Sequence, residues 1–199
     1  YKTAPSRYVL LMHGFSGSGK SHISSQLVER LGAIRIRTDV ERKRLFDYEA
    51  SDNTQSPVDG GIYTHAATQK TYEHVASQAS ILLAGGLPVI IDAANLKQWQ
   101  RALFFHLADV QAVPLIIISC SADSRVLKER VIKRAERPKT GQERDASEAK
   151  IDTLEQQQLS ADALSTNELR HTVQIHTDQS DPLDLAIREI NNHLAVSRR

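Results

Sequence analysis

This chain of 199 residues has a single cysteine and almost no excess of positive over negative charge. Its one cysteine, Cys120, cannot form an internal disulfide, which is typical of proteins from reducing compartments. Cys120 follows the apolar residues 114–119, so we expect a small buried side chain there rather than a nucleophile. The 25 basic and 24 acidic residues leave a formal net charge of +1, so a nucleic-acid partner is not expected.

Long apolar runs are missing as well. None approaches the roughly 18 residues that cross a bilayer, and no signal peptide is visible. The sequence therefore predicts a cytoplasmic protein without a membrane partner. The chain starts at Tyr1 and its only methionine is Met12, so we expect that it was cut from a longer protein.

Short apolar runs alternate with segments of helical periodicity. Continuous apolar runs are typical of strands that are covered on both faces. The predicted strands are residues 8–12, 33–36, 88–92, 114–119 and 172–176. The predicted helices are residues 20–31, 64–83, 97–108, 122–136 and 182–194, with a further helix beginning near Asp39. Residues 47–61 and 137–147 are polar and predict mobile loops.

This alternation predicts an α/β fold. The expected architecture is a three-layer sandwich of the P-loop NTPase type, with a mainly parallel five-stranded sheet and helices on both faces. We expect one domain over residues 1–199, with a helical lid over about 122–147. Trp99, Phe104 and Phe105 are spaced as core residues of a helix.

A glycine-rich stretch, "GFSGSGKS", directly follows the first predicted strand. Gly14, Gly19, Lys20 and Ser21 complete the phosphate-binding signature G-x-x-x-x-G-K-[ST]. Its glycines allow a concave backbone whose N–H groups point at phosphate oxygens, beside the positive end of a helix. The lysine reaches the β- and γ-phosphates, and the serine hydroxyl faces Mg²⁺. The alternative is a plain Gly/Ser turn.

The stretch predicts a nucleotide site with ATP and Mg²⁺ as cofactors. The expected nucleotide-binding residues are Gly14, Ser16, Gly17, Ser18, Gly19, Lys20, Ser21 and His22.

Two acidic residues end strands at the edge where α/β folds bind ligands. Asp39 follows the second strand, with Arg42 one helical turn later. A carboxylate there can accept a proton from an attacking hydroxyl, and a guanidinium can hold the acceptor. The alternative is that Asp39 only caps its helix and Arg42 is a surface charge.

Asp92 closes the third strand, where it can orient the Mg²⁺ shell through water or contact the acceptor. The next residue is Ala93 rather than the second acid of hydrolysing ATPases, which favours transfer to a substrate. The alternative is an acid that ends a strand by chance.

Three arginines share one face of the helix over residues 122–136. Arg130, Arg134 and Arg137 fall at i, i+4 and i+7. Such a row can clamp a migrating phosphoryl group when a lid closes. The alternative is a solvated basic face.

Together with these residues, six stretches carry a resemblance to a known group of proteins. They are "LLMHGFSGSGKS", "GAIRIRTDVERKRLF", "GGIYTHAATQKTYEHV", "VIIDAANL", "LKERVIKR" and "RDASEA". The chain resembles P-loop kinases of the small-molecule and polynucleotide kinase group. It looks most like the ATP-binding, AAA-type domain that bacterial bifunctional proteins carry behind an aminoglycoside-phosphotransferase-like domain.

The resemblance implies roles for individual residues. Asp39 matches the general base and Arg42 the acceptor-binding arginine. Asp92 and Asn95 match a D-x-x-N pattern after the third strand. Arg134 or Arg130 matches the lid arginine.

The expected activity is ATP- and Mg²⁺-dependent transfer of a phosphoryl group to a hydroxyl of a small molecule. The expected catalytic residues are Lys20, Asp39, Arg130 and Arg134, and Ser21 and Asp92 are the expected metal-binding residues. The expected substrate-binding residues are Asp39, Arg42, Tyr63, Asp92 and Asn95. Arg42 and Tyr63, with residues 47–61, would shape the acceptor pocket. The alternatives are a polynucleotide 5′-hydroxyl kinase, against which the acidic loop argues, and a nucleotide-binding regulatory module of a fused phosphotransferase-like domain.

Overall fold

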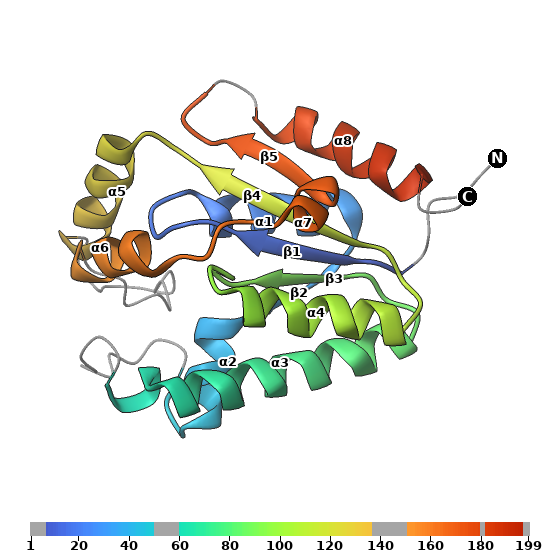
Figure 1. Ribbon diagram of the computed structural model, residues 1–199, viewed down its shortest axis with the longest axis horizontal. Helices are drawn as coiled ribbons and strands as arrows, with labels where there is room; N and C mark the ends of the chain where they lie inside the picture. The colour runs from blue at the N-terminus through green and yellow to red at the C-terminus, as the bar shows by residue number, and fades with distance from the viewer. Residues whose placement is uncertain (1–6, 50–59, 137–150, 180–181, 197–199) are drawn as a thin grey trace.

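The computed structural model describes residues 7–49, 60–136, 151–179 and 182–196. Five strands form its central sheet (Figure 1). In chain order they are β1 (Val9–His13), β2 (Ile34–Arg37), β3 (Val89–Asp92), β4 (Leu115–Ser121) and β5 (Thr172–His176). Their order in the sheet is β2-β3-β1-β4-β5, and every neighbouring pair is parallel. The predicted five-stranded α/β sheet is confirmed.

Helices cover both faces of this sheet. They are α1 (Lys20–Leu31), α2 (Thr38–Leu45), α3 (His65–Ala84), α4 (Gln98–Val110), α5 (Ser124–Glu136), α6 (Ile151–Ser160), α7 (Thr166–Arg170) and α8 (Pro182–Val196), with one 3₁₀ turn, η1 (Gly61–Tyr63). The described helices include none that is both long and apolar enough to cross a membrane.

Two apolar cores lie on opposite faces of the sheet. Successive residues of a strand point to opposite faces, and β1 follows this rule. Leu10 and Met12 join the core under α1 and α8, whereas Val9 and Leu11 join the core under α3 and α4. The three-layer sandwich expected from the continuous apolar runs follows from this two-sided burial.

The structure confirms most of the predicted elements and adds others. Phe104 and Cys120 are buried, as expected, and Trp99 and Phe105 pack partly buried against the core. The sequence did not predict α6, α7 or η1, the last of which begins at Gly61, the final residue of the expected loop over 47–61. Residues 50–59 of that loop, and all of the expected loop and lid beyond residue 136, lie outside the described residues.

Candidate functional site

The loop between β1 and α1 has a backbone that only glycine suits. Gly14, Gly17 and Gly19 have φ angles of 138°, 81° and 82°. A Cβ on Gly14 would lie 2.2 Å from the carbonyl oxygen of Cys120, and one on Gly17 would lie 2.6 Å from that of Leu127. Positive φ therefore favours glycine at all three positions, and close contact with β4 at Gly14 and with α5 at Gly17 leaves no room for a side chain there.

This loop presents backbone donors at the start of α1. Among the described residues, the amides of Gly17, Gly19, Lys20 and Ser21 donate to no protein acceptor. The first turn of a helix leaves its N–H groups open in this way, and together with the loop amides they form an anion-binding concavity. The donor set fits a chain of phosphates, as the sequence predicted.

The lysine of the signature lies across the loop. Its Nζ donates to the carbonyl oxygen of Phe15 at 2.7 Å and to Ser18 Oγ at 3.4 Å. Burial lowers the pKa of Lys20 to about 8, because the charged form loses hydration. An arriving phosphate would favour the charged form again.

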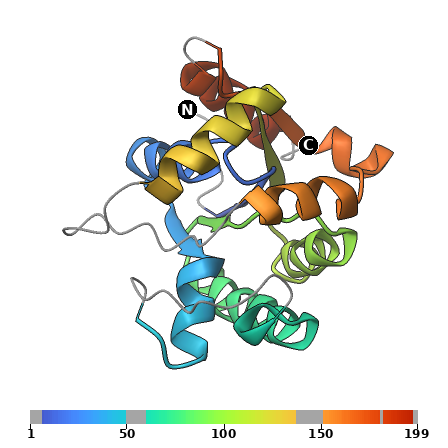
Figure 2. The same cartoon turned by 90° about the vertical axis from the view of Figure 1, so that its left-hand side faces the viewer.

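Residues from three other elements act electrostatically on this lysine. The negative charges of Asp92 and Asp39 raise the pKa of Lys20, and the positive charge of Arg134 lowers it. These residues come from β3, α2 and α5. The structure therefore brings four of the predicted site residues to one edge of the sheet. Figure 2 faces this edge and shows α5 and α6 beside each other, with α2 further along it.

Asp92 lies at this edge with a basic partner of its own. Its Oδ2 accepts hydrogen bonds from Ser24 Oγ at 3.0 Å and from Arg35 Nε at 3.0 Å, and the same guanidinium forms an ion pair with it. Arg35, in β2, is a site residue that the sequence analysis missed, although a charged side chain inside a strand of "IRIR" was a visible signal. The pair fixes the direction of the Asp92 carboxylate and balances its charge.

Asp39 is the second residue of α2 and its side chain is 25% exposed. Arg37 donates to its two carboxylate oxygens at 3.2 and 2.7 Å, and the amide of Val40 donates to Oδ1 at 2.9 Å. The carboxylate thus takes one amide of the first helical turn, although the N-cap of α2 is Arg37 and no side chain caps it. The same carboxylate also acts on Lys20, so this contact does not remove it from the site.

Arg42 is buried, so the alternative of a surface charge is wrong. It donates to the carbonyl oxygen of Ile62 at 2.7 Å and to Thr68 Oγ1 at 3.0 Å. Its guanidinium also lies 5.0 Å from the ring centroid of Tyr63. Arg42 therefore ties α2 to η1 and α3, and it brings the two residues expected at the acceptor pocket together.

Asn95 has a fully buried side chain. Its Nδ2 donates to the carbonyl oxygen of Met12 at 2.7 Å. Within the described part of the chain, its Oδ1 has no hydrogen-bond partner. The contact to Met12 holds the turn after β3 against the end of β1, directly before the glycine-rich loop.

Arg130, in α5, contacts the glycine-rich loop, so its side chain is not part of a purely solvated basic face. It donates to the carbonyl oxygen of Gly17 at 3.2 Å, and to Oγ1 and the carbonyl oxygen of Thr177 at 2.8 and 3.0 Å. Thr177 in turn donates to the carbonyl oxygen of Ser18 at 3.0 Å. Arg137, the third arginine of the row, lies outside the described residues.

The remaining residues expected at the loop lie at its end. Ser21 is partly buried and directly follows Lys20, with its amide among the open donors, whereas the side chain of His22 is exposed. The described residues contain no group of three or more His, Cys, Asp or Glu that could hold a metal ion. A metal here would be held mainly by phosphate oxygens, with the Ser21 hydroxyl as the protein ligand that the signature predicts.

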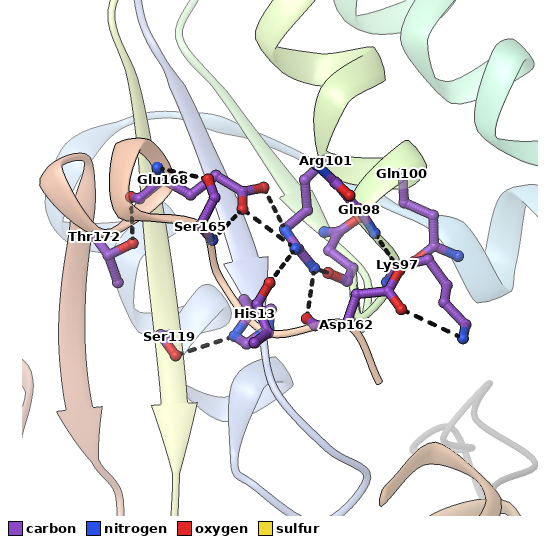
Figure 3. Close-up of polar contacts among 12 residues, drawn as sticks. His13, Lys97, Gln98, Gln100, Arg101, Ser119, Asp162, Ser165, Glu168 and Thr172 are labelled. Carbon is purple, nitrogen blue, oxygen red and sulfur yellow. Dashed lines mark hydrogen bonds and ion pairs between the residues drawn. The ribbon is translucent and has the colours of Figure 1, made fainter. Parts of the chain in front are cut away.

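A buried ion pair fixes the segment beyond α6 (Figure 3). Arg101 is fully buried and its Nε lies 2.6 Å from Glu168 Oε1. It also donates to the carbonyl oxygens of Asn95, Asp162 and Ala163 at 3.2, 3.3 and 3.0 Å. Burial raises the pKa of Glu168, but hydrogen bonds from Arg101 and Ser165 outweigh this and leave the pKa below its usual value.

His13 lies beside this pair, at the end of β1. One ring nitrogen, Nδ1, lies 3.0 Å from Ser119 Oγ. Burial, with the nearby charges of Arg101 and Lys20, lowers the pKa of His13 to about 4. The histidine is therefore neutral near pH 7.

The chain belongs to the AAA domain family, whose sequence model matches residues 9–164. Curated relatives include uncharacterized proteins of Mycobacterium tuberculosis and Mycobacterium bovis, each 31% identical over 125 residues. That match covers 63% of this chain and 25% of the relative. The chain thus spans about a quarter of the length of the curated relatives it matches.

Solved structures with the same fold include three small-molecule kinases. A sugar kinase from a Janibacter species has a TM-score of 0.64 at 21% identity, covering 94% of this chain and 93% of its own. A gluconokinase from Sinorhizobium meliloti has a TM-score of 0.59 at 20% identity, covering 98% and 94%. APS kinase CysC from Mycobacterium tuberculosis, in complex with AMPPNP and APS, has a TM-score of 0.63 at 17% identity, covering 96% and 99%. At these identities the comparisons show the fold: a P-loop kinase-like α/β domain.

Proposed function

We propose that this domain transfers the γ-phosphoryl group of ATP to a hydroxyl of a small molecule. The observation that carries the proposal is the convergence at one sheet edge of a glycine-requiring phosphate loop, its lysine and two carboxylates. The fold shared with a sugar kinase, a gluconokinase and APS kinase supports the same reaction class.

The loop amides and Lys20 hold the triphosphate in this proposal. Bound Mg²⁺, placed by the Ser21 hydroxyl and through water by Asp92, would neutralise negative charge on the phosphates. Arg134 would balance the charge that develops on the transferred group, and Arg130 would hold the lid helix against the loop.

Asp39 is the proposed general base. Its carboxylate would accept the proton of the attacking hydroxyl while the hydroxyl oxygen bonds to the γ-phosphorus, the bond from that phosphorus to the β–γ bridging oxygen breaks, and ADP leaves. Because Arg37 holds both carboxylate oxygens, the base keeps one orientation. Arg42 and Tyr63 would line the acceptor pocket next to it. For Asn95 we propose the supporting role that its buried contact to Met12 indicates.

A fused partner domain resembling aminoglycoside phosphotransferases is a second part of the proposal. It is supported by the sequence stretches that carry the resemblance. If this domain is a kinase, such a partner would bind the acceptor molecule or pass it on. If this domain is a regulatory module, the partner would carry the activity that is regulated.

The test is transfer of labelled γ-phosphate to a panel of acceptors. The panel holds sugars, sugar acids, aminoglycosides and a 5′-hydroxyl oligonucleotide. We expect product with a small-molecule hydroxyl. Labelling of only the oligonucleotide would indicate the polynucleotide kinase instead. ATP binding without transfer to any acceptor would indicate the regulatory module.

Removing the base should separate binding from transfer. Asp39→Asn is expected to lower the transfer rate by about 10²–10⁴-fold, because a positioned base contributes that much, while ATP affinity changes little. Asp109→Asn, at an exposed site near the end of α4, is the matched control and should transfer normally. Full turnover in Asp39→Asn would contradict the assigned role.

A further inference from the structure

One peptide unit of the phosphate loop is held at both of its polar ends. The carbonyl oxygen of Phe15 accepts from Lys20 Nζ at 2.7 Å. The N–H of the same peptide belongs to Ser16 and donates to Oε1 of Gln157 at 2.8 Å. The carbonyl that holds the lysine also accepts from the amide of Ser18 at 3.1 Å, and the N–H end of its peptide is held by a side chain of α6, 141 residues along the chain.

Gln157 approaches the loop from a helix that is itself well fixed. Leu154, one turn earlier on the same face, is fully buried and packs in a cluster with Leu127 and Val131 of α5. Phe15 of the phosphate loop packs partly buried against the same cluster. The apolar contact and the hydrogen bond thus come from one face of α6.

The other end of α6 is anchored to the turn that precedes α4. The carboxylate of Asp162 accepts from the amide of Gln98 at 2.8 Å, and the amide of Asp162 donates to the carbonyl oxygen of Leu96 at 2.9 Å. The buried Arg101 holds the next two carbonyl groups, as Figure 3 shows for its Asp162 contact. Because α6 packs on α5 through Leu154 and the segment after its C-terminal end is tied to this turn, Gln157 has little freedom to leave the loop.

The following residue of the loop is held from α5. Arg130 donates to the carbonyl oxygen of Gly17 at 3.2 Å. Helices α5 and α6 therefore grip the phosphate loop at Ser16 and Gly17, two consecutive residues.

We propose that Gln157 is a positioning residue for nucleotide binding, which fixes the Phe15–Ser16 peptide so that its carbonyl holds the ammonium of Lys20 in the phosphate site. This inference rests on the proposed function and names a residue that acts through the loop rather than on the substrate. A loop that is already fixed before binding loses less conformational freedom when the nucleotide binds, so the protein's affinity for the nucleotide is higher.

The decisive variant removes the amide and keeps the shape of the side chain. Gln157→Met has a similar length and helix propensity but offers no carbonyl oxygen to Ser16. Gln158→Met, at the exposed neighbouring position, is the matched control. Gln157→Glu keeps an acceptor for the Ser16 amide and serves as the conservative variant.

Two measurements are made on each variant of the whole 199-residue chain. The first is hydrogen exchange of the Ser16 amide by NMR, which needs no nucleotide. The second is the affinity for a non-hydrolysable ATP analogue with Mg²⁺, measured by calorimetry at a temperature where all variants are folded. Thermal melting shows whether a change in affinity only follows a loss of stability.

Gln157→Met should speed exchange of the Ser16 amide about tenfold or more. It should weaken nucleotide binding about three- to tenfold, the range expected for one hydrogen bond. Gln158→Met should match the wild type in both readouts, and Gln157→Glu should keep the Ser16 amide slow. If transfer is detected, Gln157→Met should raise KM for ATP more than it lowers kcat.

Unchanged nucleotide affinity in a folded Gln157→Met protein would overturn the inference, as would fast exchange of Ser16 in the wild type. Failure of the proposed function looks different. If the wild type binds nucleotide but transfers no phosphate, both readouts still decide the role of Gln157. If the wild type binds no nucleotide, the proposed function and the role of Gln157 in binding both fail, even where slow Ser16 exchange confirms the contact.

Discussion

Individual charged side chains at the site are held by neighbouring protein groups. Arg37 holds the carboxylate of Asp39, Arg35 holds that of Asp92, and the Phe15 carbonyl holds Lys20. Groups that are oriented in this way lose less freedom when a substrate binds and reacts. A substitution of the holding residue should therefore affect function even though the substrate never touches it.

The partly buried His13 should make the free energy of unfolding fall as the pH is lowered. Burial lowers its pKa to about 4 in the folded protein, against 6.5 for a histidine in water. As the pH falls below about 6.5, this histidine is protonated in the unfolded chain but stays neutral in the folded protein. The free energy of unfolding therefore falls by up to about 3 kcal/mol between pH 6.5 and pH 4. Chemical denaturation at a series of pH values measures this loss.

The matched comparison for His13 uses another histidine. His13→Asn should flatten the loss of stability between pH 6.5 and pH 4, whereas the same change at the exposed His22 should leave it unaltered. Equal slopes in wild type and His13→Asn would show that other groups cause the acid sensitivity. The comparison concerns slopes, because the smaller side chain also changes packing.

The phosphate loop as an element depends on its close fit against β4 and α5. Gly17→Ala would keep a φ of 81° that L residues rarely adopt and would bring a Cβ within 2.6 Å of the Leu127 carbonyl oxygen. We expect a loss of stability of about 1–3 kcal/mol, the cost of a strained backbone, and weaker nucleotide binding because the loop must shift.

A substitution at a second glycine distinguishes the cost of a positive φ from the cost of the close contact with Leu127. Gly86 has a φ of 89°, and a Cβ there would meet nothing within 4 Å. Gly86→Ala should therefore show the strain alone and leave nucleotide affinity unchanged. If the two variants bind nucleotide equally well, the close fit of the loop is not needed for the site.

Helices and strands differ in how far the sequence could predict them. Strands β1, β3 and β4 are nearly continuous apolar runs, and their two-sided burial makes the pattern plain, whereas the edge strands β2 and β5 alternate with polar residues. Helix α6 has the polar sequence "IDTLEQQQLS" with Leu154 as its only buried residue. Its place is fixed by contacts with the phosphate loop, α5 and the turn before α4, which no local pattern records.

For the whole molecule, the sequence could predict the edge of the sheet at which the site lies but not how its residues are held. The signature and the strand ends placed Lys20, Asp39 and Asp92 together, because parallel strands end at a common edge. The partners Arg35 and Gln157 lie 57 and 141 residues from the groups they bind. Such distant pairings depend on packing of the entire fold. The single domain over 1–199 and the lid to residue 147 stay predictions.

The central claim is that the loop around Lys20 grips a triphosphate. Calorimetric titration of the wild type and of Lys20→Met with a non-hydrolysable ATP analogue and Mg²⁺ tests it most directly. We expect saturable one-to-one binding by the wild type and affinity at least about tenfold weaker in Lys20→Met, since one charged hydrogen-bonding group contributes about 1.5–3 kcal/mol. No binding by the folded wild type, or equal binding by both proteins, would contradict it.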